Sequence, residues 1–453
     1  MKNYTFATRI TWFFLIASVL LLIYTYYRAE IILQGAQDAK YLKYYLIFLA
    51  GILFFGGVLR FQKEIRAYII TVFISLVVGL YLVEAGLTFL ELGQTDMRNL
   101  RIQAAAEFGV EYDQDTKLEV IENLASQGVD AVPAIWPRDL FEMYEEFLPL
   151  SGVSYKTTVS SNETGRRMIY QSDRYGFNNP DFEWDVEEVE WLLTGDSFTE
   201  GMSVQQGQDI TGQLREITQL SAINLGRAGN GPLIELATLT EYAGIVKPRK
   251  TLWVYYEGND LTRNLPIEKE NHLLMQYMQD GFSQNLINRQ KEIDDKLLKY
   301  LLEAQAQAQA QERLYKTRWI RLHGIRKLIG LYTNTNTNTN TNTNTNIHDP
   351  LFIKILTKAK AKAEAWGGKL YFVYLPEYSR YSEKVIAHDN YYNKSNVIEI
   401  VKKLNVPVID IHQEVFTSHP DPLSLFPFRL HGHYNADGYR EVAKAIIKGI
   451  NKY

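Results

Sequence analysis

The sequence predicts a mixed α/β domain with a parallel sheet, preceded by three membrane-spanning helices. Segments with the apolar character of strands alternate with helical segments after about residue 190. This alternation is typical of doubly wound sheets that carry helices on both faces. Three apolar runs, each close to the ~20 residues that cross a bilayer, lie near the N-terminus.

Length and composition set bounds on the function. The chain has 453 residues, enough for about two or three folded units, and a formal net charge of −4. This charge gives no electrostatic reason to expect a nucleic acid as partner. The chain has no cysteine, so disulfides, thiolate metal sites and cysteine nucleophiles are excluded.

The three apolar runs cover about residues 10–27, 41–59 and 68–90. Tyrosine and tryptophan lie at several of their ends, where membrane proteins have interfacial aromatic belts. A buried helical core is the alternative, but three such runs in succession are unusual for soluble domains. No small-residue cleavage site follows the first run, so a cleaved signal peptide is not expected. The sequence therefore predicts a multi-pass protein with the lipid bilayer as a partner.

Charged residues predict the orientation of these spans. Basic side chains gather before the first span and in the loop between the second and third, at Lys2, Arg9, Arg60, Lys63 and Arg66. The positive-inside rule places both regions in the cytoplasm. Three crossings of the cell (inner) membrane then make everything after about Glu91 extracytoplasmic. Glu84, near the end of the third span, is expected to reach interfacial water, with a functional role inside the membrane as the alternative.

Residues 92–186 lack a long apolar run and are interpreted as a membrane-proximal segment that packs onto the following domain. Residues 116–125 have helical spacing, and Gly128 marks a helix stop. Residues 132–137 are expected to be extended, because each proline disfavours a helical conformation at the residue before it. Residues 168–178 are predicted to form a strand and a turn. A mere spacer is the alternative for the whole segment.

The following domain, about residues 187–453, contains predicted strands at residues 191–195, 222–226, 251–256, 369–376 and 406–411. Helices are predicted at residues 209–219, 233–243 and 439–448. Each of the first three strands ends in small and polar residues. Because ligands of open α/β sheets bind at the carboxyl ends of the strands, a site is expected at this edge.

Ser197 follows the first of these strands in a Gly-Asp-Ser sequence and is a candidate nucleophile. The alternative is a plain turn with a helix N-cap. Attack on an acyl group builds negative charge on the carbonyl oxygen, and three donors are expected to stabilise it. These are the backbone N–H group of Ser197, a glycine N–H group near Gly229 and the side-chain amide of Asn259. His433, on a loop before the last helix, is the expected base.

Four motifs, in this order, resemble the SGNH (GDSL-type) hydrolases: Gly-Asp-Ser at 195–197, Asn-x-x-x-x-Gly from Asn224 to Gly229, Gly-Asn-Asp at 258–260 and His-x-Asn-x-x-Gly from His433. The resemblance covers about residues 187–453. It implies a flavodoxin-like three-layer α/β/α fold, with Ser197 as nucleophile and His433 as base. It also implies an oxyanion hole that contains Gly229 and Asn259, with Gly226 as the weaker choice of glycine. No cofactor is implied, and the histidines and carboxylates show no metal-ligand spacing.

Two positions depart from the pattern of that family. Glu257 stands where the family usually has glycine, and Leu430 stands where it has the aspartate that orients the histidine. Asp410, at the end of the last predicted strand, is the expected substitute for this acid, and a backbone carbonyl is the alternative. His431 is the alternative to His433 as the base.

A long insert, about residues 261–350, interrupts the predicted domain with helical patterns and two repeats. The Ala-Gln repeat that begins at Ala304 is compatible with a helix, whereas the Thr-Asn repeat at residues 333–346 favours neither a helix nor a buried strand. Both repeats are expected at the surface, and a lid over the site is the alternative. The chain is thus predicted to have three parts. These are a membrane domain at residues 1–91, a membrane-proximal segment at residues 92–186 and a hydrolase-like domain, with its insert, at residues 187–453.

These features together predict a membrane-anchored, extracytoplasmic serine esterase. Its expected substrate is an acylated, above all O-acetylated, glycan at the cell surface or on its way out of the cell. An O-acyltransferase that uses the same site is one alternative. A catalytically inactive glycan-binding or assembly component of an envelope complex is another, because the missing aspartate leaves the histidine without its usual partner.

Overall fold

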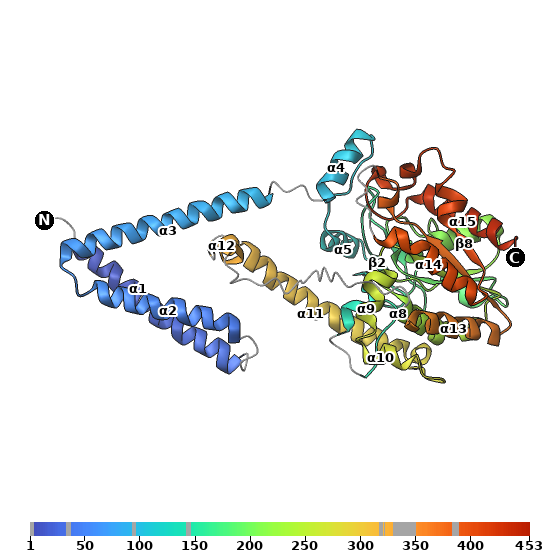
Figure 1. Ribbon diagram of the computed structural model, residues 1–453, viewed down its shortest axis with the longest axis horizontal. Coiled ribbons are helices and arrows are strands. Elements are labelled where there is room, and N and C mark those ends of the chain that lie inside the picture. The colour runs from blue at the N-terminus through green and yellow to red at the C-terminus, as the bar shows by residue number, and fades with distance from the viewer. Residues whose placement is uncertain are drawn as a thin grey trace. The chain divides into compact units, whose positions relative to one another are not determined.

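The computed structural model describes residues 4–32, 38–92, 97–141, 146–316, 320, 322–328, 350–382 and 389–453. The chain divides into two compact units (Figure 1). Met1–Thr95 and Gln305–Asn340 make up the first unit, and Asp96–Ala304 and Thr341–Tyr453 make up the second. The Thr-Asn repeat at residues 333–346 lies outside the described residues, so its predicted surface position is not tested.

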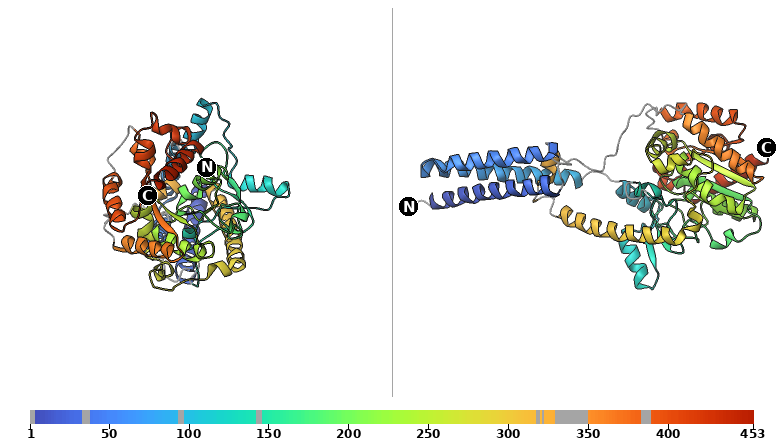
Figure 2. Two further views of the ribbon diagram at one scale, coloured as in Figure 1. Left: turned by 90° about the vertical axis from the view of Figure 1, so that its right-hand side faces the viewer. Right: turned by 90° about the horizontal axis from the view of Figure 1, so that it is seen from below.

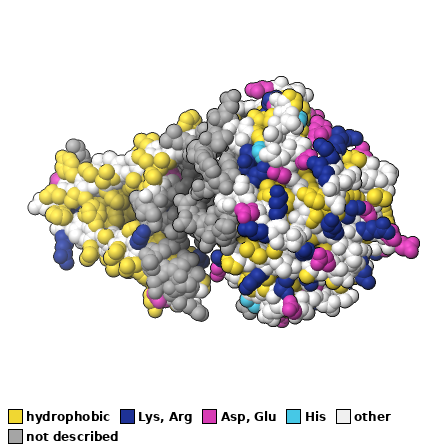
Figure 3. All heavy atoms as spheres, turned by 45° about the vertical axis from the view of Figure 1, so that its right-hand side comes forward, with side chains coloured by type: hydrophobic (Ala, Val, Ile, Leu, Met, Phe, Trp, Pro, Cys, Tyr) yellow, Lys and Arg dark blue, Asp and Glu magenta, His cyan; other side chains and the backbone are white. Residues whose placement is uncertain are grey.

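The first unit is built on three long apolar helices, α1 (Tyr4–Tyr26), α2 (Asp38–Val58) and α3 (Lys63–Leu92), with a short helix η1 (Tyr27–Ile32) after α1. By length and composition, Thr5–Ile32, Tyr41–Val58 and Lys63–Phe89 are each able to cross a membrane. Apolar side chains cover much of the outer surface of these helices (Figure 3), as helices in contact with lipid require. The predicted apolar helices are therefore present, while their orientation stays a prediction.

Glu84 of α3 is buried within the first unit, with only 1% of its surface exposed. Its Oε1 accepts the Gly324 N–H at 2.8 Å, and its Oε2 accepts the Ile325 N–H at 2.9 Å. Both donors lie in the first turn of α12 (His323–Leu328), where backbone N–H groups lack partners inside the helix. The expectation that Glu84 reaches interfacial water is therefore wrong.

A five-stranded sheet forms the centre of the second unit. Its strands are β4 (Trp191–Gly195), β5 (Ala222–Asn224), β6 (Lys250–Tyr256), β7 (Lys369–Leu375) and β8 (Val408–Asp410). They lie in the order β5-β4-β6-β7-β8, and all neighbouring pairs are parallel. The strands β4 and β6 are buried almost throughout, which fits their continuous apolar sequences. Each strand predicted for this domain is present.

Helices cover both faces of this sheet (Figures 1 and 2). On one face, α8 (Pro232–Val246), α13 (Pro350–Ala365) and α14 (Asp389–Lys403) share a core with Leu192, Trp253 and Phe372. On the other face, α7 (Ile210–Thr218) and α15 (Ala436–Ile450) share a core with Leu193, Val254 and Val373. Successive residues of a strand point to opposite faces, so both cores are built from the same strands. The second unit is thus a mixed α/β structure with a parallel sheet, as predicted.

Residues 97–186 of the described chain belong to the same unit as this sheet. They form the helices α4 (Met97–Glu107) and α5 (Lys117–Ser126) and the strands β1 (Ala131–Pro133), β2 (Thr157–Val159) and β3 (Ile169–Gln171). The strands make a separate small sheet, in which β1 is parallel and β3 antiparallel to β2. Thr116 and Glu119 form a capping box at the start of α5, which explains why that helix begins where it was predicted.

Short helices connect these elements. One connecting helix, α11 (Gln290–Lys316), is long and contains the Ala-Gln repeat. Gln305 of this repeat is exposed, as expected for a surface repeat. The remaining short helices are η2 (Pro137–Leu140), η3 (Asp181–Trp184), α6 (Ser197–Glu200), η4 (Asp260–Asn264), α9 (Leu265–Glu268), α10 (His272–Gln276), η5 (Leu286–Asn288), η6 (Tyr378–Arg380), η7 (His412–Phe416), η8 (Pro422–Leu425) and η9 (Pro427–Arg429).

Candidate active site

Ser197 lies at the carboxyl end of β4, where the strand turns into the single-turn helix α6. The Asp196 side chain caps this helix, because its Oδ1 accepts the Phe198 N–H at 2.9 Å. The first backbone N–H groups of α6 thus point out of the helix beside the serine. The serine therefore both opens a capped helical turn and stands at the sheet edge where a nucleophile is expected.

His433 faces this serine. Its Nε2 lies 2.8 Å from the Ser197 Oγ, which is hydrogen-bond distance for a nucleophile and its base. The Phe198 ring lies against the imidazole, with a centroid separation of 4.6 Å, and restricts its position. Asn435 accepts the Gly438 N–H at 2.9 Å and caps α15, which holds the loop that carries His433. The candidate nucleophile and base therefore meet as predicted.

His431 does not take the place of the base. Its side chain is exposed and lies near the Tyr378 ring, with a centroid separation of 5.6 Å. Among the described residues, the imidazole within hydrogen-bond distance of Ser197 is that of His433.

The carboxylate beside His433 belongs to Glu163, on the loop between β2 and β3. Its Oε2 lies 3.2 Å from the His433 Nδ1 and also accepts the His433 backbone N–H at 2.9 Å. Its Oε1 lies 3.0 Å from the Nη2 of Arg101, on α4. Ser197, His433 and Glu163 thus form a continuous chain of contacts with the geometry of a serine-histidine-acid triad.

Asp410 does not orient His433, which corrects the expectation drawn from the sequence. Its Oδ2 lies 2.7 Å from the Lys394 Nζ, and its Oδ1 accepts the Gln413 N–H at 3.3 Å. The reason is the strand order, because β6 and β7 separate β8, which carries Asp410, from β4. At ~4.8 Å for each strand spacing, the ends of β4 and β8 are roughly 14 Å apart.

Charges around the imidazole shift the pKa values of both partners. Burial raises the pKa of the Glu163 carboxyl, but the positive charges of His433 and Arg101 outweigh burial and hold that pKa well below its ordinary value. Burial lowers the pKa of His433, but the carboxylates of Glu163 and Asp196 outweigh burial and raise that pKa above its ordinary value. The imidazole is therefore a stronger base than a free histidine.

Residues 227–230 form a loop that packs on the end of β4. The Arg227 N–H donates to the Gly195 carbonyl at 3.3 Å, and the Asn230 Nδ2 donates to the same carbonyl at 3.4 Å. Gly229 has a φ of +79°, which favours glycine. Within the described part of the chain, neither the Ser197 N–H nor the Gly229 N–H donates a hydrogen bond, so both are available to an oxyanion.

Gly226, the weaker choice for this role, is closely packed. A Cβ on Gly226 would lie only 2.5 Å from the Cβ of Thr199, so this glycine is required by the close packing of α6. Around Gly229, the atoms nearest to such a Cβ belong to the guanidinium of Arg138, at 3.9 Å. Gly229 is thus packed less closely than Gly226, and the atoms nearest to it belong to the end of a flexible side chain.

Asn259 follows β6, and its side-chain amide has a defined orientation. Its Oδ1 accepts a hydrogen bond from the Asn264 Nδ2 at 3.0 Å, so its own NH₂ group points away from Asn264. The side chains of Asn259 and Ser197 both lie beside the buried carboxyl of Asp196, whose pKa is raised by burial to about 6. The predicted oxyanion donors are therefore gathered around the end of β4.

Glu257, where the resemblance leads one to expect glycine, has a structural role. Its carboxylate is buried, with 2% of the residue exposed, and forms an ion pair with Arg380. Its Oε1 also accepts the Glu377 N–H at 2.8 Å. These contacts join the ends of β6 and β7 and leave the triad untouched.

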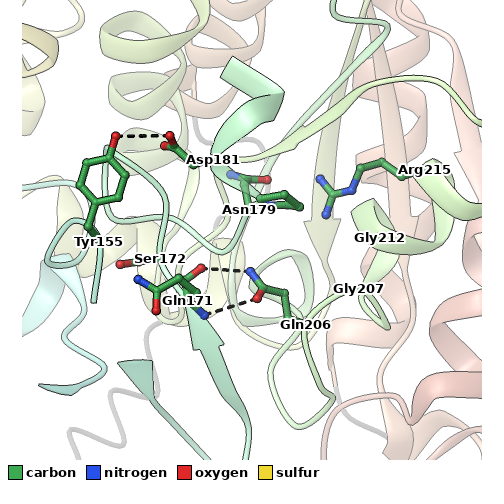
Figure 4. Close-up of a pocket in the computed structure, with 10 residues that line it drawn as sticks. Tyr155, Gln171, Ser172, Asn179, Asp181, Gln206, Gly207, Gly212 and Arg215 are labelled. Carbon is green, nitrogen blue, oxygen red and sulfur yellow. Dashed lines mark hydrogen bonds between the residues drawn. The ribbon is translucent and has the colours of Figure 1, made fainter. Parts of the chain in front are cut away.

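A pocket of about 310 Å³ lies elsewhere in the second unit (Figure 4). Gln171 and Gln206 line it and are paired, because the Gln206 Nε2 donates to the Gln171 carbonyl at 3.0 Å. The Tyr155 hydroxyl donates to the Asp181 Oδ2 at 3.3 Å. None of the triad residues lines this pocket, and these polar groups satisfy one another, so it is not the candidate active site.

No model of a known protein family matches the chain, and no curated protein sequence matches it. The resemblance to SGNH hydrolases therefore depends on the four sequence motifs.

Proposed function

We propose that the chain is a membrane-anchored serine hydrolase of the SGNH type that cleaves ester bonds. The observation that carries the proposal is the contact of 2.8 Å between the Ser197 Oγ and the His433 Nε2, continued to Glu163. Counted from β4, the strand order β5-β4-β6-β7-β8 is 2-1-3-4-5, the order of flavodoxin-like sheets, and it supports the resemblance. Leu430 stands where the family has its aspartate, and this absence favoured an inactive protein. In the proposed mechanism, Glu163 takes the place of that aspartate.

The first half of the reaction forms an acyl-enzyme. The Ser197 Oγ attacks the carbonyl carbon of the ester, and its proton passes to the His433 Nε2. The Glu163 carboxylate accepts the Nδ1–H of the imidazolium and stabilises its charge. The N–H groups of Ser197 and Gly229 and the Asn259 amide bind the oxyanion. As the tetrahedral intermediate collapses, the alcohol leaves with the proton from His433, and Ser197 keeps the acyl group.

The second half returns the enzyme to its starting state. His433 takes a proton from water, the water oxygen attacks the acyl carbon, and the acid leaves as Ser197 regains its proton. A sugar hydroxyl in place of this water would give an O-acyltransferase by the same steps. The predicted topology and the family resemblance favour an acylated glycan at the cell surface, or on its way out of the cell, as the substrate class.

The test is hydrolysis of p-nitrophenyl acetate by the purified full chain in detergent. The intact chain should release p-nitrophenol, and Ser197→Ala should lower this rate by about 10⁴-fold or more. An equal rate from Ser197→Ala would refute the proposal. Analysis of the products with an added oligosaccharide then separates hydrolysis from transfer, because only transfer yields an acetylated acceptor.

A further inference from the structure

The guanidinium of Arg138 lies over Gly229, the glycine assigned to the oxyanion hole. A Cβ placed on Gly229 would be 3.9 Å from the Arg138 Cζ and Nε and 4.0 Å from its Nη2. Arg138 is part of η2, in the segment before the parallel sheet. A substrate bound at Gly229 therefore has a permanent positive charge beside it.

Arg138 has no anionic partner within the described part of the chain. Its Nη1 donates to the Oδ1 of Asn264 at 3.2 Å. The same Asn264 holds the oxyanion loop, because its Nδ2 donates to the Asn230 carbonyl at 2.7 Å. A neutral amide thus holds the guanidinium against the site without forming an ion pair with it.

The carboxylates nearest to Arg138 are occupied by backbone groups. The Asp139 Oδ2 accepts the Trp136 N–H at 3.3 Å, and the Glu268 Oε2 accepts the Leu233 N–H at 2.9 Å. The charges of both carboxylates favour the charged form of Arg138, but within the described residues neither carboxylate forms an ion pair with it. Burial, the largest effect, and the charge of Arg263 lower the pKa of Arg138.

Two more cations extend this basic region. Arg263 is exposed on η4, its backbone N–H donates to the Asn259 carbonyl at 2.9 Å, and its positive charge acts on Arg138. The Lys117 Nζ lies 5.1 Å from the centroid of the Trp136 ring, next to η2. Neither has a carboxylate partner among the residues that the structure describes. Cations grouped in this way repel one another, and a bound anion removes that repulsion.

We propose that the substrate is an acyl ester on an acidic glycan, and that Arg138 binds a carboxylate of the sugar next to the ester. The inference rests on the proposed function and narrows its substrate class. A guanidinium binds a carboxylate through two parallel hydrogen bonds, which fixes the orientation of the sugar as well as its position. Arg263 and Lys117 then attract the acidic sugars that follow along the glycan. Arg138 is thus a residue that determines specificity, and the reacting atoms stay with the triad.

The test compares two forms of one substrate on the purified full chain: O-acetylated oligogalacturonate and its methyl ester, in which the sugar carboxylates are neutral. The intact chain should deacetylate the acid form with a kcat/KM about 10–100-fold higher, the effect of a charge-assisted hydrogen-bond pair. Arg138→Gln should bring this ratio close to one, whereas Arg138→Lys should retain part of it. Arg440→Gln, which removes an exposed arginine paired with Glu216, is the matched control and should keep the full ratio.

A ratio that is the same in the intact chain and in Arg138→Gln would overturn the inference. A binding measurement tests the carboxylate site even if the chain shows no turnover. Oligogalacturonate should bind the Ser197→Ala chain more tightly than its methyl ester does, and Arg138→Gln should remove that difference. Equal binding of both forms, or tighter binding of dextran sulfate, would contradict a carboxylate site. Loss of all esterase activity with this binding difference intact would instead reject the proposed function alone.

Discussion

At the scale of single residues, the site depends on the placement of one imidazole. The His433 ring contacts Ser197 through Nε2 and Glu163 through Nδ1, at 2.8 Å and 3.2 Å. Glu163 is itself held by Arg101 and by the backbone N–H of His433. Because each member of this chain of contacts fixes the next, removal of the acid changes both the orientation and the basicity of the histidine.

Glu163→Gln should therefore lower ester turnover by about 10³–10⁴-fold and move its pH dependence. The base must be neutral, and its pKa is raised above the ordinary value of 6.5, so kcat/KM of the intact chain should rise with pH to a midpoint above 6.5. Glutamine removes the negative charge that raises this pKa, so the midpoint should move to lower pH. Rates measured from pH 5 to 9 on p-nitrophenyl acetate test both effects.

Asp410→Asn is the control for this experiment. Its carboxylate pairs with Lys394, so turnover and the pH midpoint should stay close to those of the intact chain. A large loss of turnover in Asp410→Asn, together with an active Glu163→Gln, would show that the acid has been assigned to the wrong residue.

The same pair links pH to folding stability. The pKa of His433 is raised by folding, so its contribution is complete below its unfolded pKa of 6.5 and is lost as pH rises through the folded pKa. The pKa of Glu163 is lowered by folding, so its contribution is present above 4.5 and is lost as pH falls. The pair therefore stabilises the fold most between these values.

The sequence predicts Ser197, Gly229, Asn259 and His433 as site residues because each lies in a short motif, and the first three follow strands. It does not predict Glu163, which lies 270 residues before His433. This glutamate occupies a polar loop between two three-residue strands, and nothing in its neighbours points to the histidine. Only the folded chain brings the loop to the site, so a search near Leu430 or along the last strand could not find it.

At the scale of elements, a buried ion pair fixes the loop that carries Gly229. The Arg227 Nη1 lies 2.9 Å from the Glu200 Oε1, and neither side chain is exposed. The other oxygen, Oε2, accepts the Ala228 N–H at 2.8 Å, so a residue of α6 holds the backbone next to Gly229. The pair also contacts Tyr170 of β3, which joins the small sheet to the parallel sheet.

Glu200→Gln should destabilise the second unit by about 3–5 kcal/mol, because it leaves a buried guanidinium without its counter-charge. The matched control is Glu188→Gln, which breaks an ion pair with Arg249 whose side chains are 67% and 61% exposed. That change should cost no more than about 1 kcal/mol. Urea unfolding followed by tryptophan fluorescence measures both, and equal costs for the two variants would contradict the account.

Most elements around the site follow from patterns that the sequence displays. Continuous apolar runs predict β4 and β6, and the cap at Asp209 predicts the start of α7. The last helix begins at Ala436, three residues before the predicted 439, because Asn435 provides its cap. The three-residue strands of the small sheet are too short to show an alternating pattern, so only tertiary contacts define their pairing.

At the scale of the whole molecule, the three apolar helices are the part that length and hydropathy predict best. The spans found in the structure, Thr5–Ile32, Tyr41–Val58 and Lys63–Phe89, overlap the predicted ones. The contact between Glu84 and α12 was not expected, because it joins α3 to a segment about 240 residues later in the chain. Hydropathy reports how apolar a span is and carries no information about such pairings.

A reporter fused directly after Glu91 tests the predicted topology. Basic residues favour a cytoplasmic N-terminus and a cytoplasmic second loop, so three crossings should make the fusion point extracytoplasmic. Alkaline phosphatase should be active at this point, and a fusion within residues 60–66 should be inactive as the matched control. The reverse pattern would place the triad in the cytoplasm and would exclude a glycan outside the membrane.

Covalent labelling measures most directly whether Ser197 becomes acylated through the action of His433 and Glu163. The purified full chain should react with a fluorophosphonate probe, and peptide mass spectrometry should locate the label on Ser197. His433→Ala and Glu163→Gln should slow this labelling strongly, whereas Asp410→Asn should not. Labelling at another residue, or a rate that none of these changes alters, would contradict the account.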